Sequence, residues 1–221
     1  MVAKRRNNKR EKKSIITSRC IGNRKKTMKN DAIIKAIEIL LKAYNSTHGD
    51  ESNQIRRNAN SLKYLINQSI RQYDIPSNHW HVSEKALELW NELTNSKIEN
   101  YHYNDKVICD KLSKPKSIKL YKGGNGKGTY KKLSYGDSFK FNAVFHEDHV
   151  IPVSLILEKI VNSKMINYSS IKDILDDMHI CVILKKEDRR LGKTKGRSLI
   201  FNDIIKDVYN ENGIKLANYK F

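Results

Sequence analysis

Two short segments contain the residues whose types and spacing best suit catalysis. The first is Glu147-Asp148-His149-Val150-Ile151-Pro152, and the second runs from His179 to Arg190 and includes Asp188. A histidine can take a proton from water near neutral pH, and neighbouring carboxylates can bind a divalent cation. His149 is therefore the candidate general base, and Asp148 and Asp188 are the candidate metal ligands. Together they predict hydrolysis of a phosphodiester bond.

These segments resemble the HNH family of nucleases. Asp148-His149-Val150-Ile151-Pro152 is similar to the Asp-His-Ile-x-Pro opening of that family, and residues 179–192 are similar to its second half. Nine positions separate His179 from Asp188, which is also the family spacing. The resemblance covers residues 139–198 and implies a ββα-metal core. It also implies Mg²⁺ as cofactor, with Mn²⁺ as a substitute, and products that carry 5′-phosphate and 3′-hydroxyl ends.

Two catalytic positions depart from the family pattern. His179 stands where the family has Asn, so an imidazole would have to hold the loop of the general base. Asp188 stands where the family has Asn or His, which keeps a ligand and favours a hard ion such as Mg²⁺. Many members also carry CxxC zinc knuckles. The three cysteines of this chain form no CxxC pair, so we expect no structural zinc.

Basic residues surround the second segment. The resemblance places Arg189 and Arg190 at the start of a helix that lines the cut phosphate. A glycine-rich segment over 122–128 adds a further basic turn, for which a hairpin that enters a DNA groove and an ordinary exposed turn are both open interpretations. A phosphate-binding loop does not fit, because a strand rather than a helix is expected after it. The expected DNA-binding residues are Lys127, Arg189, Arg190, Lys193, Lys195 and Arg197.

The overall charge also points to nucleic acid. The chain has 43 Lys and Arg against 24 Asp and Glu, a net charge of +19, and no apolar run long enough to span a bilayer. Residues 1–29 are expected to be a flexible basic arm along phosphates, with a solubilising terminus as the alternative. Scattered cysteines and the lack of a signal-peptide pattern favour a cytoplasmic location without membrane contact.

The elements that must position these residues form two expected modules in an α+β fold. Residues 30–112 are expected to be a helical module for DNA binding or dimerisation, because apolar residues recur at helical spacing over 33–44, 55–73 and 83–93. Between the second and third helices, His79-Trp80-His81 is interpreted as a packed loop rather than a metal site.

Residues 113–221 are expected to contain a β-hairpin, the nuclease core and a C-terminal helix. Strands are predicted over 116–121 and 129–133, followed by a strand in which Phe139, Phe141, Ala143 and Phe145 alternate into the Asp-His motif. Helices over 153–164 and 170–178 precede the strand over 180–184, and a helix over 202–213 closes over the core. His146, three residues before His149, is a candidate to contact the metal ligands rather than the metal itself.

These features predict a metal-dependent endonuclease that cuts double-stranded DNA. The size of the chain favours a sequence-specific type II restriction enzyme, acting as a homodimer on a symmetric site and encoded beside a protective DNA methyltransferase. Two alternatives stay open. One is a homing or phage-type HNH nicking enzyme, and the other is a non-catalytic nucleic-acid-binding protein whose HNH fold has decayed.

Overall fold

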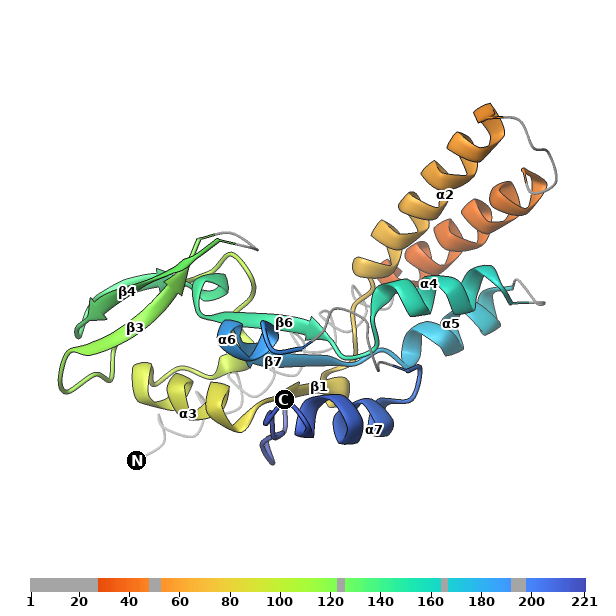
Figure 1. Ribbon diagram of the computed structural model, residues 1–221. Coiled ribbons are helices and arrows are strands. Elements are labelled where there is room, and N and C mark those ends of the chain that lie inside the picture. The colour runs from red at the N-terminus through yellow and green to blue at the C-terminus, as the bar shows by residue number, and fades with distance from the viewer. Residues whose placement is uncertain (1–27, 48–52, 123–125, 164–166, 192–197) are drawn as a thin grey trace, which may run out of the picture. The chain divides into compact units, whose positions relative to one another are not determined.

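The fold is a mixed α+β arrangement with three small sheets among the described residues, as expected at the level of fold class (Figure 1). The computed structural model describes residues 28–47, 53–122, 126–163, 167–191 and 198–221. The chain divides into two compact units: Met1–Asp74 with Leu157–Leu175, and Ile75–Ile156 with Asp176–Phe221.

The first unit is helical. A helix over residues 28–46 is followed by α2 (Asn53–Arg71), both of which the apolar spacing predicted. Ile37 and Leu41 on the first helix and Ile66 on α2 are fully buried, as expected for an apolar stripe. The Asn30 side chain donates a hydrogen bond to the carbonyl of Asp74 and accepts one from its N–H, both at 2.9 Å. These two hydrogen bonds join the first helix to Asp74, shortly after the end of α2, and so tie the two helices together.

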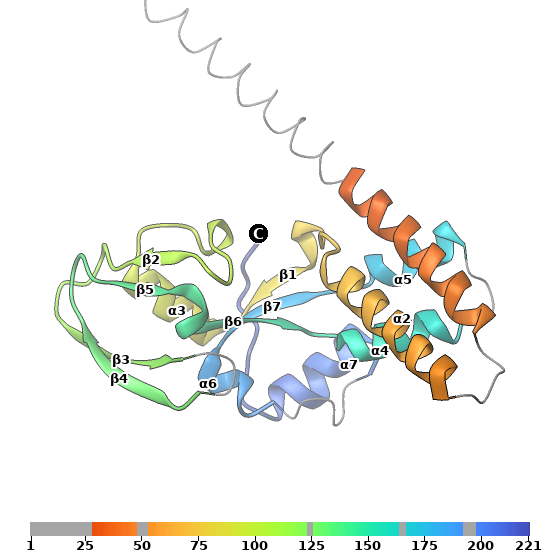
Figure 2. The same ribbon diagram turned by 90° about the horizontal axis from the view of Figure 1, so that it is seen from above.

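The second unit is built on a three-stranded sheet of β1 (Trp80–Val82), β6 (Phe145–His149) and β7 (Ile180–Leu184). The strand order is β1-β7-β6, with β7 parallel to β1 and antiparallel to β6 (Figure 2). Every residue of β7 is buried, which explains its continuous apolar sequence. The connection from β6 to β7 contains α4 (Val153–Val161) and α5 (Tyr168–Asp176).

Helix α3 (Glu84–Leu93) packs on this sheet. Its N-cap is Ser83, whose side chain accepts a hydrogen bond from the N–H of Ala86. Trp90 is 1% exposed and its ring centroid lies 5.5 Å from that of Phe145. A 3-10 turn, η1 (Ser77–His79), precedes β1, and another, η2 (Ile98–Asn100), follows α3.

Two pairs of antiparallel strands complete the unit and lie on either side of α3 in Figure 2. One pair is β2 (Lys106–Ile108) with β5 (Ser138–Lys140). The other is the predicted hairpin of β3 (Lys116–Tyr121) and β4 (Gly128–Leu133).

The prediction of one continuous strand into the Asp-His motif is wrong. Strand β5 ends at Lys140, and a 3-10 turn, η3 (Phe141–Ala143), separates it from β6. The turn lets Phe141 stack on Phe145 with ring centroids 5.1 Å apart, both rings fully buried. Burial of these rings in one cluster therefore outweighs the period-two pattern that suggested a strand.

The C-terminal segment forms the predicted helix in modified form. Helix α7 (Phe201–Ile204) continues directly into a π-helix, η4 (Ile205–Asn210). Gly213 follows with φ of 67°, the left-handed conformation in which a glycine commonly ends a helix. The helical segment therefore ends before Gly213, near the predicted end, and its second part has the wider turns of a π-helix.

The two units change at Asp74–Ile75, at Ile156–Leu157 and at Leu175–Asp176, so α3 and β2 belong with the sheet that carries the Asp-His motif. Packing explains this, because Trp90 and Val107 lie in the same buried cluster as Phe145. The expected division into domains at residue 112 stays a prediction. Residues 1–27 of the expected arm lie outside the described residues. Among the described helices, none combines the length and apolarity that a membrane span needs.

Candidate metal centre

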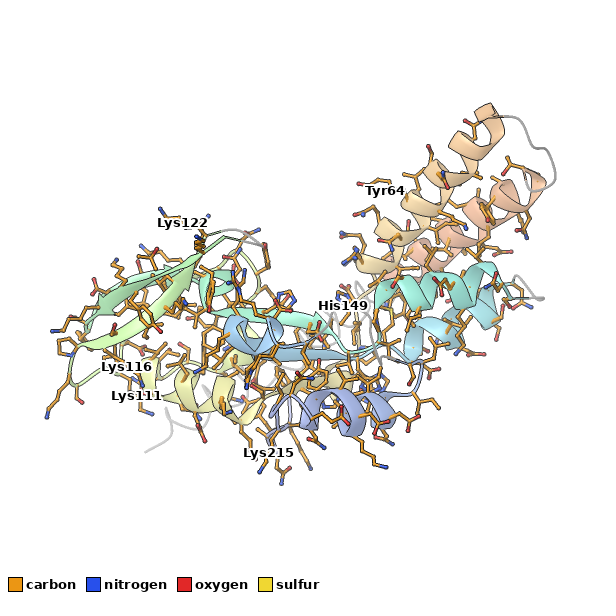
Figure 3. The ribbon with its side chains drawn as sticks, viewed as in Figure 1. Tyr64, Lys111, Lys116, Lys122, His149 and Lys215 are labelled. Carbon is orange, nitrogen blue, oxygen red and sulfur yellow. The ribbon has the colours of Figure 1, made fainter. Side chains whose placement is uncertain are left out.

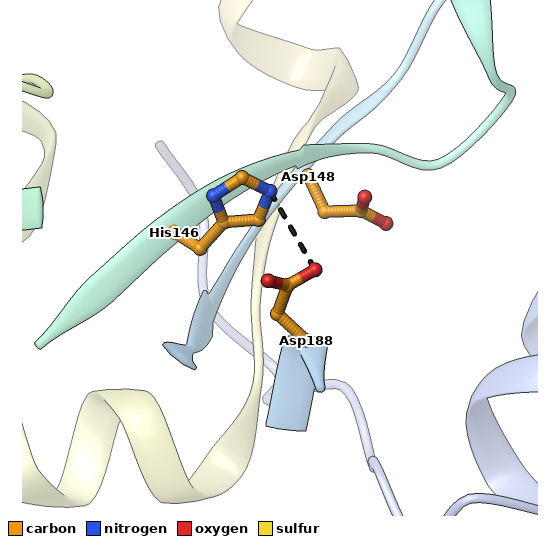
Figure 4. A group of neighbouring side chains, drawn as sticks. All are labelled: His146, Asp148 and Asp188. Carbon is orange, nitrogen blue, oxygen red and sulfur yellow. Dashed lines mark ion pairs between the residues drawn. The ribbon is translucent and has the colours of Figure 1, made fainter. Parts of the chain in front are cut away.

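Three side chains of the second unit converge on one point: His146, Asp148 and Asp188 (Figure 4). Each offers a ligand atom, and these atoms all lie within 4.8 Å of one another. The Nε2 atom of His146 is 3.7 Å from Oδ1 of Asp188. Two carboxylates and one imidazole at this spacing are a donor set that can hold a divalent cation.

The local order of strand, strand and helix brings these residues together. His146 and Asp148 are two residues apart on β6, so their side chains leave the same face of the strand. Strand β7 runs back alongside β6 and leads directly into a short helix, α6 (Lys185–Asp188), whose last residue is the third member. Cys181, opposite Asp148 on β7, is buried, and burial raises the pKa of its thiol well above the usual value.

A buried glutamate fixes the start of α6. The carboxylate of Glu187 accepts hydrogen bonds from the Ser83 hydroxyl at 2.7 Å and from the Leu184 N–H at 2.9 Å. The second bond satisfies an N–H at the helix start, and the first ties α6 to the end of β1. The Lys185 N–H also donates to the carbonyl of Val144 at 2.9 Å. These bonds hold the helix, and Asp188 with it, against β6.

A tyrosine orients the aspartate on β6. The hydroxyl of Tyr209, from η4, donates a hydrogen bond of 2.5 Å to Oδ2 of Asp148. Tyr209 is fully buried and Asp148 is 8% exposed, so the bond is shielded from water. The side chains of His146 and Asp188 are 31% and 35% exposed. The cluster is therefore buried on the side of Asp148 and open to solvent on the side of His146 and Asp188.

The expected general base lies next to the cluster in sequence but on the other face of the strand. His149, labelled in Figure 3, is the last residue of β6 and pairs with Ile180. Strand alternation places its side chain on the face opposite to Asp148. Glu147 shares the His149 face and is 3.3 Å from Nδ1 of His102. Burial raises the pKa of Glu147. Thus the imidazole that joins the two expected ligands is that of His146.

His179 supports the loop after His149 through its main chain. Its carbonyl accepts a hydrogen bond of 3.0 Å from the N–H of Val150. The resemblance gives the task of holding this loop to the side chain at position 179, and the sequence left open whether an imidazole could perform it, whereas the hydrogen bond to Val150 comes from the main chain. The imidazole instead lies 3.0 Å from His81, measured from Nδ1 of His179 to Nε2 of His81.

The His179 ring belongs to an aromatic stack that the sequence did not predict. It lies between the rings of His79, at a centroid distance of 4.2 Å, and Phe201, at 4.1 Å. Burial, followed by the nearby His79 and His81, lowers the pKa of His179 to about 4. The pKa of His81 is lowered by the same burial and by His79. The His-x-His pair is thus packed, as expected.

The basic residues after Asp188 have protein partners where the structure describes them. The Nη2 atom of Arg189 donates to the carbonyl of Gly126 at 2.5 Å, and its guanidinium lies 4.4 Å from the centre of the Tyr121 ring. Nη2 of Arg190 is 3.9 Å from Oε1 of Glu187. Lys127 is exposed. Lys193, Lys195 and Arg197 lie outside the described residues.

Sequence reasoning missed the roles of His146 and Tyr209. His146 could have been found, because its spacing of two residues from Asp148 on a strand puts both side chains on one face. Tyr209 gave no signal, since it is 61 residues from its partner and lies in a segment with an ordinary apolar pattern. The function of the chain must be argued from this geometry, because no family model, curated protein or solved structure matches the chain.

Proposed function

We propose that this protein is a metal-dependent endonuclease that hydrolyses phosphodiester bonds in double-stranded DNA. The observation that carries the proposal is the meeting of Asp148 from β6 and Asp188 from α6 in one cluster with an imidazole. The net charge of +19 supports a polyanionic substrate. The order β6, β7, α6 supports an HNH-like core at this site, with α4 and α5 inserted between its strands.

The donor set fits a divalent cation. Asp148 and Asp188 would hold Mg²⁺ or Mn²⁺ through carboxylate oxygens, and His146 adds a nitrogen that Mn²⁺ accepts more readily than Mg²⁺. Such a cation supplies positive charge against the negative charge that develops on the phosphate group. The bond from Tyr209 keeps Asp148 in one orientation before any ligand arrives.

The attacking water must give its proton to a histidine that does not ligate the cation. An imidazole that ligates a cation has used the lone pair that would accept the proton, so His146 and the base have to be different residues. We assign the proton transfer to His149, the next imidazole along β6, as the resemblance to HNH nucleases implies. His149 is the last residue of β6, and strand alternation places it on the face opposite to Asp148, so this assignment rests on the resemblance.

The finer proposal is a type II restriction enzyme. It rests on the size of the chain and on the resemblance, and it includes a homodimer, a cognate methyltransferase and a cytoplasmic location. A nicking enzyme of the homing or phage type is the alternative within nucleases. One observation favours a non-catalytic DNA-binding protein instead: His179 and Arg189, both expected at the reaction, are engaged in protein contacts.

Cleavage of supercoiled plasmid tests the proposal. We expect the parent protein to cut with Mg²⁺ or Mn²⁺ and to be inactive in EDTA. Asp148→Asn and Asp188→Asn should each lower the rate by about a hundredfold or more, because each removes a charged ligand. Asparagine at 148 still accepts the Tyr209 hydrogen bond, which protects the fold. Asp203→Asn, an exposed aspartate on α7, is the matched control.

The pattern of products separates the candidates. Discrete fragments indicate a sequence-specific enzyme, nicked circles alone indicate a nicking enzyme, and a smear indicates a non-specific nuclease. Plasmid that is bound but left intact with either ion would overturn the enzyme and favour the DNA-binding protein.

A further inference from the structure

The β3–β4 hairpin is positively charged, and none of its described residues belongs to the candidate metal centre. Residues 116–133 contain six lysines and no acidic residue. A basic segment without compensating acids is typical of a surface that contacts phosphate groups. The arrangement of these lysines shows which face of the hairpin could do so.

The strand register sorts the hairpin into two faces. Ile118 and Leu133 share one face, are 5% and 0% exposed, and pack into the core of the unit. The other face contains the pair Lys119 and Tyr130 and its neighbours on both strands. We call it the tyrosine–lysine face, which consists of Lys119, Tyr121, Tyr130 and Lys132.

The side chains of this face are packed together, and all except Tyr121, which is 7% exposed, are partly or fully open to solvent. The Nζ atom of Lys119 lies 5.8 Å from the centre of the Tyr121 ring and 5.5 Å from that of Tyr130. Tyr130 is 69% exposed, and Lys132 is exposed. Gly128 makes the close packing possible, because a Cβ there would lie 2.8 Å from both Lys119 and Tyr121 atoms. The face thus presents ammonium groups and a tyrosine hydroxyl.

A groove of about 430 Å³ runs between this face and α3. An ion pair between Lys116 of β3 and Glu92 of α3 joins its two walls. The other charged residues that line it are Lys85, Lys119, Lys186 and Glu88. The groove is therefore cationic, with tyrosine rings along one wall.

The groove is connected to the candidate metal centre through α6. Arg189 covers the Tyr121 ring at 4.4 Å and hydrogen-bonds to Gly126, so it fastens α6 to the hairpin. The preceding residue, Asp188, belongs to the His146 cluster. A polymer that lies in the groove would accordingly reach the helix that carries a candidate ligand.

We propose that this groove and the tyrosine–lysine face bind the sugar-phosphate backbone of duplex DNA beside the point of cleavage. Lysine and tyrosine side chains are common donors to phosphate oxygens, and such contacts fix the register of a protein on DNA. The inference rests on the proposed nuclease function for the reaction, and it goes beyond that function by naming the surface that holds the substrate. Arg189 is a positioning residue for this surface, because it links the hairpin to α6.

Binding of a fluorescent duplex in EDTA, where no cleavage occurs, tests the inference. The variant is Lys119→Ala with Lys132→Ala, and the matched control is Lys206→Ala with Lys215→Ala, two exposed lysines of the same unit. We expect the hairpin variant to raise Kd about tenfold and to lower the slope of log Kd against log salt by about 2, one unit per lost phosphate contact. The control should stay within about twofold of the parent. Thermal unfolding of each variant checks that its fold is intact.

Other outcomes overturn the inference in distinct ways. Equal weakening by the two variants would show that total charge, rather than the groove, binds DNA. A parent that does not bind the duplex, or a single strand that binds more tightly and is equally sensitive to the hairpin variant, would contradict the duplex as ligand. If the parent cuts plasmid while the hairpin variant binds like the control, the inference fails and the nuclease stands. If the hairpin is required for binding and no cation supports cleavage, the inference stands and the proposed nuclease function fails.

Discussion

At the scale of single residues, we propose that the two imidazoles on β6 have different roles, one as metal ligand and one as general base. His146 faces Asp148 and Asp188, whereas His149 lies on the opposite face of the same strand. Mutation of a metal ligand weakens metal binding, and a higher metal concentration can restore the activity. A higher metal concentration cannot restore activity that is lost with the general base. The two histidines can therefore be told apart by the concentration of cation that each variant needs.

We predict that His149→Ala lowers the cleavage rate about a hundredfold or more at saturating Mn²⁺ and leaves duplex binding within about twofold of the parent. His146→Ala should instead raise the Mn²⁺ concentration for half-maximal rate about tenfold, with most of the saturated rate retained. Metal titrations of single-turnover cleavage measure both quantities. The reverse result, with the saturated rate lost only in His146→Ala, would assign the base to His146 and leave His149 as a residue of the opposite face.

The stack of His79, His179 and Phe201 makes the free energy of unfolding depend on pH. The folded pKa of His179, about 4, lies below the usual 6.5, so folding favours the neutral ring. The stabilisation is complete above pH 6.5 and is lost as the pH falls toward 4, since the unfolded chain then binds the proton more readily. Because the ring is only half buried, we expect a loss on the order of 1 kcal/mol between pH 7 and pH 5.

Urea unfolding at these two pH values measures this loss. His179→Phe keeps an aromatic ring in the stack and removes the titrating group, so its free energy of unfolding should change less between pH 7 and pH 5 than that of the parent. An equal change in both proteins would place the proton uptake elsewhere.

At the scale of elements, Arg189 links the hairpin to α6 by a stack on Tyr121 and a hydrogen bond to Gly126. A lysine keeps the charge of an arginine but cannot reproduce a planar stack combined with a directed N–H donor. Arg189→Ala and Arg189→Lys should therefore both lower the cleavage rate at saturating DNA, by about tenfold.

Single-turnover rates at saturating duplex measure the effect, and Arg71→Lys on α2 is the matched control. Recovery of the parent rate by Arg189→Lys would show that Arg189 acts through its charge on a phosphate and not as a link between elements.

The elements also show what the sequence could and could not predict. Helix α3 and the β3–β4 hairpin followed from local signals, an N-cap and a glycine-rich turn. The meeting of Asp148 with Asp188 was expected from their residue types and from the resemblance to HNH nucleases. The bond from Tyr209 and the contact of His81 with His179 join residues 61 and 98 positions apart. Periodicity and spacing describe neighbours along the chain, so they carry no information on such contacts.

At the scale of the whole molecule, we propose that a basic terminal segment supplies general affinity for DNA and that the candidate metal centre supplies cleavage. Residues 1–30 contain twelve Lys and Arg against one Glu, a net charge of +11, which leaves +8 for the rest of the chain. Charge concentrated in one terminal segment adds affinity for any duplex through release of counterions, and it carries little sequence information. The candidate metal centre, in contrast, lies within a folded unit.

Deletion of residues 1–13 removes seven Lys and Arg and one Glu. We predict weaker binding to all duplexes and a flatter salt dependence, because fewer counterions are released, with the cut positions and the rate at saturating DNA unchanged. Binding isotherms over a range of salt concentrations and mapping of the cut ends measure these quantities. A deletion that moves the cut positions would show that this segment selects the site, since the folded unit alone would then be insufficient to place the reacting phosphate at Asp148 and Asp188.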